Sequence, residues 1–310
     1  MDFLLQLVLL VVGFAMLVKG ADWFVEGTAG IARKFGIPQL VIGLTIVAMG
    51  TSAPEAAVSI TAGLKGNAGI SIGNVVGSNI LNILIILGIS AVIVALAIQE
   101  STIKYETPYM IFITVVLLAM GYTGGEISFL EGVILWVLFI VYLAYLFRLA
   151  KNGKEEDATE DRSPLLLLLS GIVGGVIIVW GSNITVDSAT AIAKMIGLSE
   201  SFIGLTIVAL GTSLPELVTS VTAAKKGNAD IAIGNIVGSN IFNILFVLGT
   251  TALITPIPFA SNFLIDSVIA ILAGVLLWIS VFKTKKLTRM WGIIMLLCYA
   301  AYFVYLYVSM

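Results

Sequence analysis

Hydrophobic residues occur along this chain in long blocks that short polar segments separate. A helix needs about 20 apolar residues to cross the hydrocarbon core of a bilayer, where backbone polar groups must be satisfied without water. The blocks have helical length. They predict an all-α polytopic membrane protein with ten spans, at roughly 3–32, 39–64, 70–98, 107–121, 128–148, 164–193, 201–224, 231–254, 263–282 and 290–308.

The composition agrees with a membrane protein. Of the 310 residues, 59% are hydrophobic and 11% are charged, and the mean hydropathy is +1.11, far outside the usual range of water-soluble domains. The first block lacks a positive n-region and contains Lys19, Asp22 and Glu26, so we interpret it as mature structure rather than a signal peptide. The single cysteine, Cys298, excludes an intrachain disulfide.

The distribution of basic residues predicts the orientation. With the N-terminus outside, thirteen lysines and arginines fall in inner loops and two, Lys65 and Lys194, fall in outer loops. Because positive residues are enriched on the cytoplasmic side, both termini are expected to be extracellular and the polar segment 151–164 to be a cytoplasmic linker. The expected location is the cell membrane.

The chain repeats itself at an offset of 161 residues. Segments 42–88 and 203–249 share 33 identities in 47 positions, without a gap. The predicted organisation is a first repeat at 1–150, the linker at 151–164 and a second repeat at 165–310. Since each repeat holds five spans, the two must have inverted topology, which is typical of secondary transporters with a site near the membrane midplane.

The motif GTSxPE interrupts the second span of each repeat, ending at Glu55 and Glu216. Proline within a helix removes one backbone donor and opens the preceding turn, so carbonyls there become available as ligands. Ser52 and Ser213 lie three residues before these glutamates and also match the capping box of ordinary helix starts. Capping does not explain a carboxylate deep in an apolar span, which costs several kcal/mol unless it is paired or hydrated.

The third span of each repeat carries the motif GNxxGSNxxN. Ser78 and Asn82 share one helix face, as do Ser239 and Asn243, because they are four residues apart. Both pairs are candidate cation ligands. The alternative is close helix packing through glycines, with asparagine as interhelical glue.

The candidate ligands are all oxygen atoms, and the chain contains no histidine. Carboxylate, hydroxyl, amide and backbone oxygens in a flexible cage favour calcium and sodium, whereas magnesium demands tight octahedral geometry and keeps its waters. Two glutamates can neutralise one divalent ion.

These paired motifs resemble the two alpha repeats of the calcium/cation antiporter superfamily, most closely its prokaryotic sodium/calcium exchangers. The resemblance covers nearly the whole chain and implies central carboxylates at Glu55 and Glu216. It further implies ligands from backbone carbonyls, hydroxyls and amides at Thr51, Thr212, Ala48, Ala209, Ser52, Ser213, Ser78, Ser239, Asn82 and Asn243. Potassium-dependent relatives have aspartate at one of the last two positions, so asparagine at both argues against potassium cotransport.

The resemblance implies a secondary active antiporter that exchanges sodium for calcium by alternating access, with a shared cation cluster between Glu55 and Glu216. A proton/calcium antiporter is the alternative within this class, and a calcium-selective channel is a further one. An enzyme is not expected, since neither a metalloprotease motif nor a nucleophile–base pair occurs. The expected partners are calcium, sodium and the lipid bilayer, with no cofactor, nucleic acid or obligatory protein partner.

Overall fold

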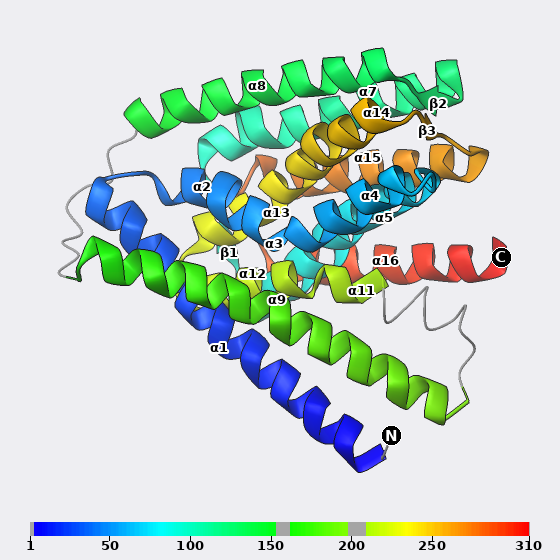
Figure 1. Cartoon of the computed structure of the whole chain (residues 1–310). Helices are drawn as coiled ribbons and strands as arrows, with labels where there is room; N and C mark the ends of the chain where they lie inside the picture. The colour runs from blue at the N-terminus through cyan, green and yellow to red at the C-terminus, as the bar shows by residue number, and fades with distance from the viewer. Residues whose placement is uncertain (1–2, 153–161, 198–208, 310) are drawn as a thin grey trace.

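The computed structural model describes residues 3–152, 162–197 and 209–309, which are almost entirely helical (Figure 1). The first part of the chain contains α1 (Phe3–Phe35), α2 (Gln39–Ile42), η1 (Gly43–Val47), α3 (Ala48–Thr51), α4 (Ala53–Leu64), α5 (Gly69–Leu81), η2 (Asn82–Leu87), α6 (Gly88–Ile93), β1 (Leu96–Ala97), η3 (Thr102–Glu106), α7 (Thr107–Gly124), β2 (Glu126–Ile127) and α8 (Phe129–Asn152). The second part contains α9 (Pro164–Met195), α11 (Ala209–Thr212), α12 (Leu214–Lys225), α13 (Ala229–Phe242), η5 (Asn243–Leu248), α14 (Gly249–Ile254), β3 (Ile257–Pro258), α15 (Ser261–Phe282), β4 (Lys286–Leu287) and α16 (Arg289–Ser309). The η segments are π-helical.

Within the described residues, eight helices are long and apolar enough to cross a membrane, and the bent pair over 39–64 raises the number to nine. These nine match nine of the ten predicted spans, with ends that differ by at most five residues. The remaining prediction, 201–224, lies partly outside the described residues, which there begin at α11. The chain is therefore a mostly helical, multi-pass membrane protein.

The end of the third predicted span, 70–98, is wrong. The helix stops at Ile93, because Val94 adopts extended backbone angles and Leu96–Ala97 forms the strand β1. Strand β1 pairs antiparallel with β4, and β2 pairs in the same way with β3. Each short ladder joins the first part of the chain to the second. It also provides hydrogen-bond partners for backbone groups that are not paired within a helix.

The helices form a central core with peripheral helices around it. In α13, η5 and α14, 94% of the most apolar window is buried, whereas the corresponding fraction is 22% in α8 and 17% in α16. The long helices α1 and α9 lie side by side beneath this bundle (Figure 1). They approach closely through glycine: a Cβ on Gly27 would lie 2.4 Å from the backbone nitrogen of Gly171.

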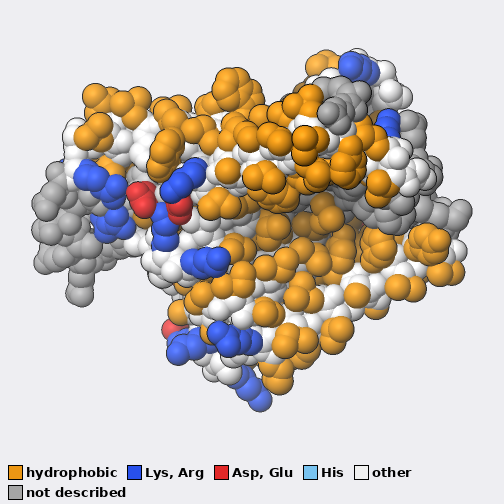
Figure 2. Space-filling model, turned by 90° about the horizontal axis from the view of Figure 1, so that it is seen from below, with side chains coloured by type: hydrophobic (Ala, Val, Ile, Leu, Met, Phe, Trp, Pro, Cys, Tyr) orange, Lys and Arg blue, Asp and Glu red, His pale blue; other side chains and the backbone are white. Residues whose placement is uncertain are grey.

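The surface matches a lipid environment. Large hydrophobic side chains are exposed along α1, α8, α9 and α16, where a water-soluble protein would place polar residues. In Figure 2, hydrophobic side chains cover most of the visible face and lysine and arginine gather mainly toward its left end. The exposed apolar band is the surface expected to contact acyl chains.

A cluster of charged residues at the surface joins the segments next to strands β1 and β4. Glu100 forms ion pairs with Lys104 and with Lys285, the latter at 2.9 Å. Hydrogen bonds from Lys104 and Lys285, together with their charges, lower the pKa of Glu100 to about 2. Because this pKa is lower when folded than the roughly 4.3 of a free glutamate, the pairs stabilise the fold above about pH 4 and are lost as the pH falls toward 2.

We therefore expect Glu100→Gln to lower the Tm slightly, and by a constant amount, between about pH 8 and pH 5, because exposed ion pairs contribute little. The difference from the parent protein should then shrink on further acidification. Thermal unfolding of both proteins in detergent, followed from about pH 8 down to about pH 2, measures this difference. A difference that grows with acidification contradicts this assignment.

Candidate functional site

The candidate site is built around two helix breaks. The first bends the chain by 51° between Gln39–Thr51 and Ala53–Leu64. Ser52, at the break, has φ −83° and ψ 7°, and Ser213 has nearly the same angles, φ −90° and ψ 4°, between α11 and α12. Pro54 and Pro215 then open the following helices, where a missing N–H costs nothing. The predicted breaks are confirmed.

The serines at these breaks do not cap the helices that they precede. Ser52 forms no capping hydrogen bond and donates instead to Glu216 Oε1 at 2.8 Å. Ser213 likewise forms no cap and donates to Glu55 Oε1 at 3.2 Å. The capping-box interpretation is therefore wrong, and each break supplies a hydroxyl to the carboxylate of the other half.

Both carboxylates are buried. Glu55 is 1% exposed and Glu216 is 0% exposed, and neither forms an ion pair with a described lysine or arginine. In each, the second oxygen, Oε2, is buried without a hydrogen-bond partner among the described residues. An uncompensated carboxylate is costly at such a depth, so the pair requires a positively charged ligand or protons.

Two asparagines add a second pair of unpaired oxygens. The amide nitrogen of Asn82 donates to Asn240 Oδ1 at 2.9 Å, and that of Asn243 donates to Asn79 Oδ1 at 3.2 Å. With their donors occupied, the Oδ1 atoms of Asn82 and Asn243 are buried and have no described partner. All four asparagines therefore bond between helices, and Asn79 and Asn240 also donate to each other's backbone carbonyls at 3.1 and 3.2 Å.

The other predicted ligands lie around these groups. Ser239 Oγ donates to the carbonyl of Ala48 at 3.4 Å, and Ser213 Oγ lies 3.5 Å from Ser78 Oγ. Thr51 Oγ1 donates to Asn235 Oδ1 at 2.9 Å, whereas Thr212 Oγ1 is buried without a described partner. Ala209 is the first residue of α11, and nothing is described of its side chain.

Sequence reasoning missed one supporting layer. Asn235 donates to the backbone carbonyl of Glu216 at 3.4 Å and to Ser220 Oγ at 2.9 Å. Asn74 makes the corresponding bonds to Glu55 and Ser59, at 3.2 and 2.9 Å. Their presence in both copies of the repeated motif was the available signal, but only the structure shows which atoms they hold.

The polar groups suit a hard cation. The described residues contain no cluster of three or more acidic, histidine or cysteine side chains, so the charge comes from Glu55 and Glu216 alone. Neutral hydroxyl, amide and backbone oxygens surround them. This set of donors fits calcium and sodium, which accept mixed oxygen ligands, better than zinc or copper, which prefer nitrogen and sulfur.

Asn235→Ala tests the supporting layer. It removes the donors to Glu216 and Ser220 and the acceptor for Thr51. Residues beside both helix breaks therefore lose a hydrogen bond to α13. Outer groups of this kind change metal affinity by roughly 10- to 100-fold. We expect the calcium concentration for half-maximal binding to rise by about tenfold. Calcium titration of the purified variant measures this, and unchanged affinity contradicts the anchoring role.

Comparisons with known proteins agree with this geometry. Residues 5–148 and 166–308 match the family described as sodium/calcium exchanger protein. The chain is 37% identical over 315 residues to the putative antiporter CaxA of Alkalimonas amylolytica, covering 96% of this chain and 98% of that protein. It is 32% identical to the sodium/calcium exchanger MaX1 of Methanosarcina acetivorans, covering 96% and 97%.

A solved structure has the same fold. The sodium-calcium exchanger NCX_Mj, soaked with zero Na⁺ and Ca²⁺, superposes with a TM-score of 0.86 at 33% identity, over 98% of this chain and 100% of that one. The family match spans both copies of the motif that carries the buried glutamates, Glu55 and Glu216. The chain belongs to the sodium/calcium exchanger family.

Proposed function

We propose that this protein is a secondary active antiporter that exchanges sodium for calcium across the membrane by alternating access. The observation that carries the proposal is the set of four buried oxygens without partners, from Glu55, Glu216, Asn82 and Asn243. They lie on helices from both halves, in a family of sodium/calcium exchangers. No organic cofactor is needed, because the transported ions fit the ligands directly.

The charges explain how the two ions are coupled. Glu55 and Glu216 together carry two negative charges, which one calcium ion neutralises. Sodium ions that share the same carboxylates exclude calcium by electrostatic repulsion. The serines, Ala48 and Ala209 serve the flanking sodium positions, and Thr51 and Thr212 offer backbone carbonyls to calcium. Exchange is then obligatory, because only loaded states switch between the two faces.

Reciprocal contacts support two inverted repeats, 1–150 and 165–310. The pair Asn79–Asn240 bonds in both directions, and Ser52–Glu216 has its counterpart in Ser213–Glu55, each shifted by the repeat offset. Such reciprocity is expected of halves related by a two-fold axis. The proposed arrangement has ten spans in the cell membrane, extracellular termini and a cytoplasmic linker at 151–164.

The close glycine contacts of α1 and α9 fit a moving pair of helices. On α9, a Cβ on Gly174 would lie 2.5 Å from the backbone nitrogen of Phe24, and one on Gly181 would lie 2.9 Å from Leu17 nitrogen. Small residues at these positions allow the backbones to approach closely. We propose that α1 and α9 slide across the ion-binding core and expose it to one side at a time.

Calcium uptake into proteoliposomes loaded with sodium tests this function. Uptake should require internal sodium and should be lost when potassium replaces it. Uptake driven equally well by a pH gradient identifies a proton/calcium antiporter instead. Calcium flux that needs no counter-ion identifies a channel. Either of these results overturns the proposal.

A further inference from the structure

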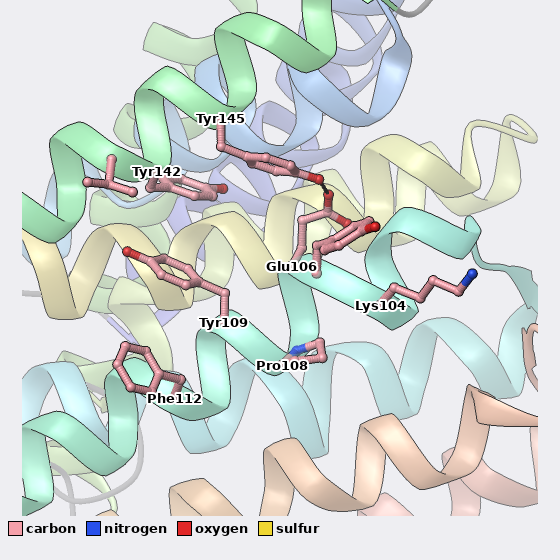
Figure 3. Close-up of a pocket in the computed structure, with 9 residues that line it drawn as sticks. Lys104, Glu106, Pro108, Tyr109, Phe112, Tyr142 and Tyr145 are labelled. Atoms are coloured by element: carbon pink, nitrogen blue, oxygen red, sulfur yellow. Dashed lines mark hydrogen bonds between the residues drawn. The ribbon is translucent and has the colours of Figure 1, made fainter.

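A second buried carboxylate lies away from the ion-binding core, in a pocket between η3, α7 and α8 (Figure 3). The pocket has a volume of about 350 Å³, within the range of small-molecule sites. Its lining is almost entirely apolar and aromatic, with Glu106 and Lys104 as the charged members.

Glu106 is 1% exposed and takes no part in the network around Glu55 and Glu216. Its Oε1 accepts a hydrogen bond from the hydroxyl of Tyr145. Its Oε2 is buried and has no hydrogen-bond partner among the described residues. The hydroxyls of Ser101 and Thr102, close to Glu106 along the chain, are also buried, and neither makes a hydrogen bond of normal geometry to a described residue.

Aromatic rings line the pocket on both sides of Glu106. Tyr105 and Tyr145 lie with ring centroids 6.3 Å apart and planes tilted by 51°, and Tyr109 stacks on Tyr142 at 5.8 Å. Figure 3 shows Tyr142 and Tyr145 on α8 facing Glu106 and Tyr109 across the pocket. Tyrosine faces attract cations electrostatically, and the attraction increases when water is excluded.

The mouth of the pocket is apolar. Tyr105, Phe112 and Val141 are each more than half exposed, on helices long and apolar enough to span the membrane. A ligand therefore meets acyl chains rather than water on its way in, and its body must be hydrophobic.

The second charge in the lining, Lys104, does not cancel the field of Glu106. The Lys104 side chain is 60% exposed and is ion-paired with Glu100. Its charge is thus compensated and solvated at the rim, while the carboxylate of Glu106 is buried. The deep end of the pocket retains a negative group facing aromatic surface.

We propose that this pocket binds a positively charged ammonium group attached to an apolar body. The ammonium pairs with the free oxygen of Glu106, the faces of Tyr105 and Tyr145 flank it, and the apolar part extends past Phe112 and Val141 toward lipid. The source of such a group is either the ethanolamine headgroup of a phospholipid or a free membrane-partitioned amine.

The pocket is in contact with the ion-binding core. Tyr142 donates from its hydroxyl to the carbonyl of Leu44 at 3.4 Å, in the segment that leads into the first helix break. Met110, one turn after Glu106, accepts from the amide of Asn240 at 3.6 Å. A ligand here touches Tyr142, whose hydroxyl bonds to the segment before the first helix break, whereas Met110 lies behind the lining on the same helix as Tyr109.

Octylamine and 1-octanol, which share an apolar chain and differ in the charged head, test the proposal. The Tm of the purified full-length protein in a zwitterionic detergent is followed as each is titrated, so the result does not depend on transport. We expect octylamine to raise the Tm at roughly tenfold lower concentration than octanol, because the ion pair and cation–π contacts add to its binding. In Glu106→Gln this ratio should fall severalfold toward one, because only the ring contacts then favour the amine.

Asp266→Asn is the matched control. Asp266 also lies in a membrane-spanning helix and accepts a tyrosine hydroxyl, that of Tyr302 at 2.9 Å, but it does not line the pocket. It should keep the parent ratio. If Glu106→Gln does not fold, Tyr105→Leu, which removes one ring, should lower the ratio severalfold.

Equal action of octylamine and octanol on the parent protein, or an unchanged ratio in Glu106→Gln, overturns the proposed site.

Repeating the titration in vesicles separates the two sources of the ammonium group. If the headgroup of phosphatidylethanolamine is the occupant, the octylamine response should be weaker there than in phosphatidylcholine. Equal responses in the two lipids assign the pocket to a free amine.

Discussion

Replacing Glu216 by glutamine is expected to abolish sodium-driven calcium uptake. The change keeps the size of the side chain and removes one of two buried negative charges. Two unit charges about 4 Å apart attract each other by about 4 kcal/mol at an effective dielectric constant near 20. Since about 1.4 kcal/mol corresponds to a factor of ten, calcium affinity should fall by at least about 100-fold. Initial uptake rates in sodium-loaded proteoliposomes measure the loss.

Glu55→Gln should behave in the same way, because Glu55 is equally buried and equally lacks a partner for its Oε2. Asp266→Asn, which neutralises a carboxylate in a membrane-spanning helix outside this site, should retain uptake near the parent level. If either glutamine variant transports calcium at more than about a tenth of the parent rate, its carboxylate is not a shared ligand.

Gly238→Val should also reduce exchange severely, by a different route. A Cβ at this position on α13 would lie 2.7 Å from the carbonyl oxygen of Leu44 and 2.8 Å from the Cβ of Ala48. Overpacking of this kind typically costs about 1–3 kcal/mol and shifts the backbone. The shift would move the first helix break away from Ser239, whose hydroxyl contacts the carbonyl of Ala48. We expect uptake to fall at least about tenfold, because about 1.4 kcal/mol of this cost corresponds to a factor of ten. The Tm should also be lower than that of the parent protein.

Gly69→Val provides the control, because the structure gives Gly69 no described heavy atom within 4 Å of an added Cβ. It should leave uptake and Tm close to parent values. Normal transport by Gly238→Val would mean that α13 and the helix break can separate without disturbing the ions. The close packing between them would then be irrelevant to function.

Much of the helical architecture could be predicted from hydrophobic block length. Helix α1 was expected at 3–32 and occupies Phe3–Phe35, and α16 was expected at 290–308 and occupies Arg289–Ser309. The helix breaks at Ser52 and Ser213 followed from the prolines two residues later. These features depend on local chemistry, namely apolar length and the missing N–H of proline, so the sequence is sufficient.

The wider helical turns could not be predicted. Asn82 and Asn243 each begin a π-helical segment, η2 and η5, and π-helical turns are frequent at functional sites. A π-helical turn shifts the side chains that follow it relative to the 3.6-residue repeat. Local sequence does not reveal it, because its stability comes from packing against other helices. The strands at Leu96–Ala97 and Ile257–Pro258 depend in the same way on distant partners.

For the candidate site, the sequence indicated residue types but not hydrogen-bond partners. Glu55 and Glu216 were evident because a buried carboxylate is costly and both repeats retain it. That Ser52 donates to the glutamate of the opposite half, rather than capping its own helix, depends on how the halves pack. The roles of Asn74 and Asn235 likewise rest on bonds to backbone carbonyls, which no sequence pattern specifies.

Equilibrium calcium binding to the purified protein, measured by isothermal titration at increasing sodium concentrations, is the most direct test of a cation site shared by Glu55 and Glu216. We predict that sodium displaces calcium competitively and that Glu55→Gln and Glu216→Gln, each as a single substitution, weaken calcium binding by at least about 100-fold. Calcium binding that sodium does not affect, or that keeps its affinity after loss of either carboxylate, would contradict a shared site.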